Sequence, residues 1–310
     1  ARPRPGDDDP QVWERRMGWW WDENPFCKAD SPRGHVLRHE GAEIVGFSGF
    51  IPFDYEADGK TLPTLAATTF FVREGHRSAV MGLLARLRQL ARHYQIVDGS
   101  PSPEMRRLLE KLGYQCAGDR SQFLFPTSRL GGSAARALLR QLGWSFELPG
   151  IGEADGHRVV TDPADWHHTV PGSDGQIHRV LSRESLSWLC RVGSESRSFF
   201  GLVDADGEPV AHAIGVYKRL GGILVCRLLD YREYRPGGQG VPRLIGHLLT
   251  DPAAGLDPST AVLVYSCFGT LPCTDLPGRR APSILHYQIP AGWEQHSKAC
   301  LPCEGDLALV

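Results

Sequence analysis

The spacing of apolar and polar positions divides the chain into two stretches with a similar order of elements. In the first stretch, apolar segments at 36–39, 44–55 and 65–72 predict three strands. The Asp58-Gly59 pair between the last two is a hairpin turn signal. Pairing of strands that follow one another is the simplest arrangement, so we expect an antiparallel meander here.

The hydrophobic period then changes, and two helices are predicted. Apolar residues from 80 to 94 recur three and four positions apart, with arginines on the other face, and Ser78 is placed to cap the start. The elements expected after this helix are a strand at 96–99, a helix at 103–112 with Ser102 as N-cap, and a closing strand at 115–125.

The second stretch repeats this order. It contains a hairpin at 198–217 through Asp206-Gly207, a strand at 221–231, a helix at 242–249 and a strand at 260–267. The segment EIVGFSGF aligns with EPVAHAIG, and LAATTFFV aligns with LVCRLLDY, so the repeat concerns element order more than identities. We therefore predict an α/β fold (α+β, mixed sheets) of two halves, each a mostly antiparallel twisted sheet flanked by helices. The predicted boundaries are 1–128, a connector at 129–158 with a short helix at 134–142, and 159–310.

Aromatic residues concentrate in 11–30, which holds four tryptophans among charged positions. This pattern predicts a helix and turn that cap a domain. The rings are expected to pack in a core, and the alternative is an aromatic wall for a ligand. Trp166, His167 and His168 are expected on a surface loop.

Charge and length restrict the classes of function. The chain has 310 residues with 34 Lys+Arg against 36 Asp+Glu, which gives no broad attraction to nucleic acid or to an anionic membrane. No stretch approaches the roughly 20 apolar residues of a transmembrane helix, and the segment ARPRPGDDDP lacks the apolar core of a secretory signal. A cytoplasmic protein, monomeric or homodimeric, is expected.

Eight cysteines are scattered along the chain. Only Cys300-x-x-Cys303 has a metal-site spacing, and Cys267 with Cys273 could complete a four-thiolate zinc site. The wider spacing of the second pair favours thiols without metal, so no metal is predicted.

Three segments carry a resemblance to a known family: TTFFVREGHRSAVMGLLARL, VDGSPS and PEMRRLLEKLGY. They resemble the GNAT superfamily of acyl-CoA-dependent N-acyltransferases, and in particular tandem-GNAT proteins of bacterial exopolysaccharide and nucleotide-sugar pathways. The resemblance covers residues 34–126 well and 185–310 more weakly. It implies that the N-terminal half binds acetyl-CoA or another acyl-CoA and that the C-terminal half binds the acceptor.

The turn before the first long helix is the expected cofactor site. A helix N-terminus favours a pyrophosphate through its N–H donors and its dipole. The family turn, R/Q-x-x-G-x-G/A, matches here at Arg77 and Gly82, whereas Ser78 and Val80 stand where glycine is usual. The end of the preceding strand would pair with the pantetheine arm. The cofactor-binding residues implied by the resemblance are Phe71, Val72, Arg73, His76, Arg77, Ser78, Ala79, Val80, Met81, Gly82 and Ser102.

Proton transfer needs a group that the first half does not obviously offer. An alkylammonium with a pKa of ~10.4 must lose a proton before it attacks a thioester. The resemblance places a tyrosine at Leu109 and an acid on the strand that here holds Thr68 and Thr69. Thr69 is retained as a candidate catalytic residue because of this position.

The second half offers Asp230 and His212 on neighbouring predicted strands. Each has a structural alternative. His212 lies between two alanines, as half-buried histidines with satisfied hydrogen bonds often do, and Asp230 could pair with Arg232 or Arg227.

The resemblance predicts transfer of an acetyl or other short acyl group to a primary amine of a small molecule, by direct attack in a ternary complex. A nucleotide-linked amino sugar is the acceptor implied by family analogy. The alternatives are a peptidoglycan-type aminoacyl transferase, and a non-catalytic CoA- or ligand-binding protein. The second half lacks a convincing CoA turn, because Pro242 interrupts its glycine spacing.

Overall fold

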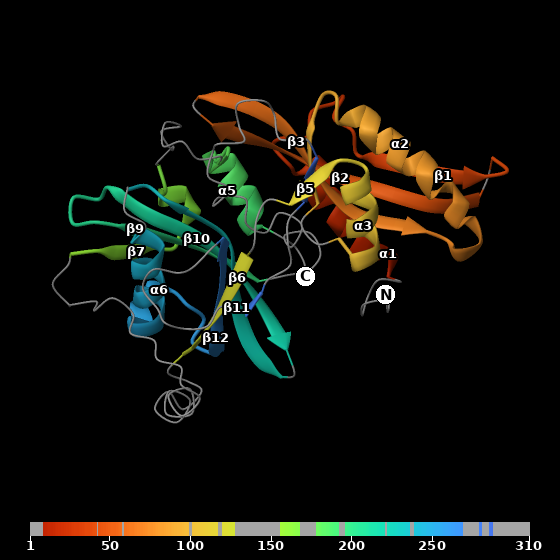
Figure 1. The fold of residues 1–310 in the computed structure, drawn as a ribbon. Helices are drawn as coiled ribbons and strands as arrows, with labels where there is room; N and C mark the ends of the chain where they lie inside the picture. The colour runs from red at the N-terminus through yellow and green to blue at the C-terminus, as the bar shows by residue number, and fades with distance from the viewer. Residues whose placement is uncertain are drawn as a thin grey trace. The chain divides into compact units, whose positions relative to one another are not determined.

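The computed structural model shows two compact units. The first comprises chain segments 1–118, 171–180 and 282–310, and the second comprises 119–170 and 181–281 (Figure 1). The structure describes residues 9–41, 43–57, 59–98, 101–116, 120–127, 156–167, 178–191, 196–220, 222–235, 239–268, 279–280 and 285–287. Within these residues, no helix is both long and apolar enough to pass through a membrane.

A seven-stranded mixed sheet forms the centre of the first unit. Its strands, in spatial order, are β1 (Gly34–His39), β2 (Glu43–Ala57), β3 (Lys60–Val72), β4 (Gln95–Asp98), β14 (Leu285–Tyr287) and β5 (Tyr114–Cys116), with β8 (His178–Arg179) paired to β2. The predicted meander is confirmed, since β1–β2 and β2–β3 are antiparallel. The β3–β4 pair is parallel because helix α2 connects the two strands.

Two helices cover one face of this sheet. Residues Leu84 and Leu87 of α2 (Val80–Leu90) and Leu109 of α3 (Pro103–Lys111) share a core with strand residues such as Phe50 and Ile96. Leu109 is therefore a core position, and a tyrosine there would have to bury its hydroxyl.

The predicted helix caps have different outcomes. Ser102 caps α3, its Oγ accepting a hydrogen bond from the Met105 N–H at 3.2 Å, as predicted. Ser78 does not cap α2. The 3₁₀-helix η2 (Glu74–Ala79) precedes α2. The N-cap of α2 is Ala79, which makes no side-chain hydrogen bond.

The tryptophan-rich segment closes the outer edge of β2. It forms α1 (Pro10–Met17) and the π-helix η1 (Gly18–Asp22), and Trp20 is fully buried, which confirms core packing. The indole N–H of Trp21 donates to the Phe50 carbonyl at 2.8 Å. The Asn24 amide donates to the Pro52 carbonyl at 2.8 Å and to the Trp20 carbonyl at 2.9 Å. Side chains thus replace a neighbouring strand along this part of β2.

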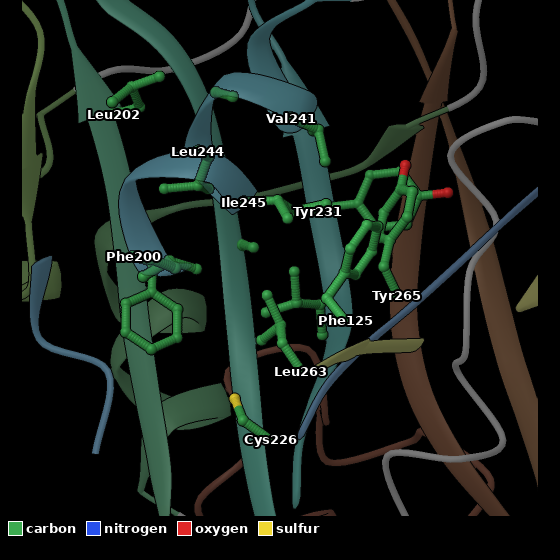
Figure 2. Packing of buried hydrophobic residues seen from close by; sticks show 14 of the residues in the cluster. Phe125, Phe200, Leu202, Cys226, Tyr231, Val241, Leu244, Ile245, Leu263 and Tyr265 are labelled. Atoms are coloured by element: carbon green, nitrogen blue, oxygen red, sulfur yellow. The ribbon is translucent and has the colours of Figure 1, made fainter. Parts of the chain in front are cut away.

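The second unit has its own seven-stranded sheet. Its strands, in spatial order, are β13 (Arg279–Arg280), β6 (Arg120–Pro126), β12 (Thr260–Phe268), β11 (Ile223–Glu233), β10 (Pro209–Leu220), β9 (Arg197–Val203) and β7 (Arg158–Val160). The helices are α5 (Arg183–Cys190), α6 (Gly240–Thr250), and the 3₁₀-helices η3 (Pro163–Asp165) and η4 (Pro252–Ala254). Figure 2 shows α6 pointing Val241, Leu244 and Ile245 at the sheet residues, which are buried with them.

The repeat predicted from the sequence is present in both sheets. Strands β2, β3 and β4 pair antiparallel and then parallel, as do β10, β11 and β12. Each central strand also carries one extra residue: Thr69 in β3 and Leu229 in β11. When the two bulges are superposed, Thr69 aligns with Leu229, which is one residue away from its partner in the alignment made from the sequence.

The strand expected at 115–125 is instead two strands in different sheets. β5 belongs to the first unit, whereas β6 pairs with β12 in the second. β14, from near the C-terminus, fills the place between β4 and β5. Each unit is therefore built from separate segments of the chain. Strands that follow one another in sequence usually pair, but β5 and β6 do not. The predicted connector helix at 134–142 lies outside the described residues.

Replacing Asn24 by alanine is expected to destabilise the first unit. Asn24 is 4% exposed and also accepts from the Phe26 N–H at 2.9 Å, so Asn24→Ala leaves buried backbone groups unsatisfied. The free energy of unfolding should fall by about 2–4 kcal/mol in urea titrations followed by tryptophan fluorescence. Gln89→Ala, on the exposed side of α2, should change it by less than about 0.5 kcal/mol. Equal stability of the two variants would contradict this role.

Candidate functional site

The bulge at Thr69 is the main irregularity of β3. Thr68 pairs with Gly49 and Phe70 with Ser48, which leaves Thr69 as the extra residue, at φ 45°. A positive φ is rare for a β-branched residue and costs about 1–3 kcal/mol. Bulges and such strain occur frequently at functional sites. The candidate role of Thr69 therefore lies in its backbone, while its hydroxyl lies 3.5 Å from that of Thr68.

One edge of β3 is only partly covered by a neighbouring strand. The parallel pairing with β4 ends at Ala66 and Val97, although β3 continues to Val72. No strand among the described residues pairs with residues 67–72 on that side. Backbone N–H and C=O groups on this edge can bind an extended ligand as an added strand. Phe71, at the end of the edge, is 55% exposed.

The segment after β3 is only partly the open turn that the sequence predicts. In η2, the His76 N–H donates to the Arg73 carbonyl at 2.9 Å and the Val80 N–H donates to the Arg77 carbonyl. These donors are not available to a ligand. Gly82, in the first turn of α2, is exposed, and a Cβ added to it would meet nothing within 4 Å.

The cations of this segment form surface ion pairs. Arg73 pairs with Glu43, and Arg77 pairs with Glu74 at 3.8 Å. The His76 ring lies 4.6 Å from the His39 ring. Such exposed pairs contribute little stability, so these side chains can exchange partners for an anion at small cost.

The remaining predicted cofactor residues differ in exposure. Ser78 and Met81 are exposed, while Val72, Ala79 and Val80 are half-buried. Ser102 uses its hydroxyl as the α3 cap, and it is exposed.

The equivalent helix terminus of the second unit is filled by the protein itself. Glu233 lies four residues after its bulge, as Arg73 does in the first unit. Its Oε1 accepts from the Val241 N–H at 3.0 Å, at the start of α6. A Cβ on Gly240 would come within 2.7 Å of the Val210 carbonyl oxygen, so this turn also packs directly on β10. A carboxylate of the protein itself therefore lies at the N-terminus of α6.

His212 and Asp230 lie on one face of the second sheet, opposite α6. His212 pairs across the strands with Arg232, and Asp230 with Ile214. His212 is fully buried and Asp230 is 7% exposed. The two predicted residues therefore share a face, as strand alternation requires, and His212 is more buried than expected.

Two residues that the sequence left aside hold His212 in place. Its Nδ1 lies 2.9 Å from the Tyr234 hydroxyl, which accepts the Trp166 indole N–H at 3.2 Å. Burial raises the pKa of Tyr234 to about 12, so the phenol stays protonated and can donate. When Tyr234 donates, Nδ1 is the acceptor and the imidazole proton is on Nε2; the phenol oxygen can also accept from the Nδ1–H tautomer. Trp166 is 2% exposed, so the surface loop predicted for it is wrong.

No metal centre emerges from the described part of the chain: no three His, Cys, Asp or Glu residues gather there to hold an ion. Cys267 lies on β12, and Cys273, Cys300 and Cys303 lie outside the described residues.

The fold matches solved acyltransferase structures. A GCN5-related N-acetyltransferase from Anabaena variabilis has TM-score 0.52 and 14% identity, covering 82% of this chain and 62% of that one. A probable N-acyltransferase from Enterococcus faecalis has TM-score 0.55 and 10% identity, covering 91% and 66%. Saccharomyces cerevisiae N-myristoyltransferase with bound myristoyl-CoA has TM-score 0.52 and 11% identity, covering 94% and 78%.

These likenesses establish a GNAT-type fold of mixed sheets flanked by helices. The chain spans 62% and 66% of the first two structures, which is less than two thirds of their length. No protein-family model matches the sequence, and neither does the sequence of any curated protein.

The position of Glu233 predicts a distinct pH dependence. Burial raises the pKa of Glu233 above its ordinary value, and the N–H groups of Val241 and Gly240 only partly oppose this. The protonated form is thus favoured by folding, and this contribution to stability is lost as the pH rises through the folded-state pKa. Glu233→Gln keeps the Oε1 acceptor without the charge. It should be more stable than the parent at pH 7.5, with the difference shrinking towards pH 4.

Urea midpoints at both pH values measure this effect. Glu208→Gln, an exposed carboxylate at the start of β10, is the matched control and should track the parent. A Glu233→Gln protein less stable than the parent at pH 7.5 would show that the charge stabilises the helix terminus.

Proposed function

We propose that this protein is an acyl-CoA-dependent N-acyltransferase whose first unit binds the acyl-CoA. The observation that carries the proposal is the free edge of β3 between its bulge and the exposed first turn of α2. A pantetheine arm fits such an edge as an added strand, with the pyrophosphate over the helix N-terminus. The GNAT-type fold and the resemblance of residues 34–126 support the same placement.

Only one unit is proposed to bind the cofactor. In the second unit, Glu233 occupies the N-terminus of α6, where a pyrophosphate would meet like charge. This unit is left to bind the acceptor, a primary amine. A nucleotide-linked amino sugar is retained from family analogy as the acceptor to test first.

The proposed reaction is direct aminolysis. The neutral amine attacks the thioester carbonyl carbon, the C–N bond forms, the C–S bond breaks, and CoA leaves as its thiolate. The proton released by the amine passes to a base and then to the thiolate. The bulge at Thr69 presents backbone N–H groups next to the thioester and so orients its carbonyl.

Asp230 is proposed as the proton acceptor, and His212 as the residue that positions it. In this proposal the Tyr234 hydroxyl donates to His212 Nδ1, which makes the imidazole a donor at Nε2. Asp230 lies on the same face and offers carboxylate lone pairs. The two groups act as a unit in this proposal.

Gly82→Asp tests the cofactor site. The new carboxylate would face the pyrophosphate and should weaken CoA binding by well over tenfold, measured by calorimetry. The fold should not suffer, because the position is open and an acid near a helix N-terminus is favourable. Gly82→Ala adds bulk without charge and should bind CoA about as the parent does. Unchanged CoA affinity in Gly82→Asp would overturn the assignment.

A pH profile of turnover tests the proton path. With acetyl-CoA and a panel of nucleotide-linked amino sugars, Asp230→Asn should lower kcat by about 10²–10⁴-fold while CoA binding stays intact. His212→Gln should lower it less, and Tyr234→Phe, which releases Nδ1, should shift the profile along the pH axis. Parental turnover by both Asp230→Asn and His212→Gln across pH 6–9 would assign deprotonation to water instead.

A further inference from the structure

Helix α2 and the residues next to it carry charge of one sign only. The sequence from 75 to 97 has four arginines and two histidines but no aspartate or glutamate, although the whole chain has a formal net charge of -2. The arginines are all exposed, and they are Arg77, Arg86, Arg88 and Arg92. Exposed like charges repel one another, so this set does not serve to stabilise the helix. It favours a negatively charged partner instead.

Three of these arginines pair with no acid in the described part of the chain. Arg86 donates to Gln89 Oε1 at 3.0 Å, which leaves its charge uncompensated. Neither Arg88 nor Arg92 forms a salt bridge to a described carboxylate. We call the side of α2 that bears Arg86, Arg88 and Arg92 the basic face.

The basic face follows directly on the proposed cofactor site. Met81, in the first turn of α2, is 56% exposed. With 1.5 Å per residue, Arg88 lies about 10 Å further along the helix axis than Met81. Figure 1 shows α2 running along the outside of the first unit. A phosphate group at the start of α2 leaves the charges towards its other end for a larger partner.

The turn before α2 offers few hydrogen-bond donors to phosphate oxygens. The N–H groups of His76 and Val80 are used within η2. CoA presents its pantetheine arm through a pyrophosphate, whereas an acyl carrier protein presents the same arm through a single phosphodiester. A turn with few donors suits the phosphodiester better.

We propose that the basic face of α2 docks an acidic acyl carrier protein, which lays its phosphopantetheine arm on the free edge of β3. This inference rests on the proposed function and names a second donor for the same site. Charge complementarity selects an acidic surface, and the exposed Met81 supplies an apolar contact. The covalent step is unchanged: the C–N bond forms, the C–S bond breaks, and the thiolate on the carrier's arm takes up the proton.

Calorimetry on the full chain at low salt tests the docking surface. The probes are a bacterial acyl carrier protein without its arm, the same protein with its arm, and a short DNA duplex. The armless carrier should bind, the armed carrier should bind about tenfold more tightly, and both affinities should fall with added salt. Both forms binding more weakly than about 1 mM would overturn the proposal. Equal affinity of the two forms, or DNA binding as tight as the armed carrier, would overturn it as well.

A separate titration with CoA distinguishes this inference from the proposed function. CoA binding without carrier binding would refute the docking surface and leave the cofactor site standing. Carrier binding without CoA binding would instead contradict the proposed use of acyl-CoA.

Charge variants locate the docking surface. Arg88→Glu should weaken carrier binding by more than tenfold, and Arg88→Gln should weaken it less, while CoA affinity stays unchanged. Arg158→Glu makes the same charge change at an exposed position of β7 in the second unit and should leave carrier affinity unchanged. Urea midpoints check that the variants remain folded. An equal loss in Arg88→Glu and Arg158→Glu, or parental affinity in Arg88→Glu, would refute the docking surface.

Discussion

Parallel pairing between β3 and β4 covers three residue pairs and then ends, while β3 continues for six more residues. This end of pairing leaves one edge of β3 without a partner strand among the described residues. A central strand normally satisfies its backbone on both sides, so an unpaired edge next to a helix N-terminus requires a replacement partner. The bulge at Thr69 lies within this edge, and η2 and then α2 follow its end. The helices α2 and α3 stabilise this sheet by packing on one of its faces through residues such as Leu84 and Leu109.

The second unit uses the same frame for another purpose. Its bulge and its parallel β11–β12 pair repeat those of the first unit, yet a residue at one equivalent position has the opposite charge, Glu233 in place of Arg73. An arginine beside a helix N-terminus leaves the anion position open, whereas a glutamate fills it. The two units thus share this frame and differ in the charge that lies beside the helix N-terminus.

The polar face of the second sheet is organised by aromatic rings. Trp166 and Phe199 flank the His212 ring, with centroids 6.0 and 5.8 Å away, and the Tyr234 hydroxyl lies 2.9 Å from its Nδ1. The hydrogen bond at Nδ1 and the packing of these rings around His212 offset part of the cost of burying a polar side chain.

The sequence by itself determined the elements that depend on local periodicity and capping. The β1–β2–β3 meander, the α3 cap at Ser102, the hairpin at Asp206-Gly207 and the repeated element order all follow from residues close together in the chain. It also placed His212 and Asp230 on neighbouring strands, but the register of β10 with β11 and the extra residue Leu229 decide that they share a face. The exchange of β6 and β14 between the sheets depended on pairing partners more than a hundred residues apart, for which no local pattern exists. The strain at Thr69, the capture of the α6 terminus by Glu233 and the contact of Trp166 with Tyr234 were likewise decided by tertiary structure, because each requires side chains or strands that only folding brings together.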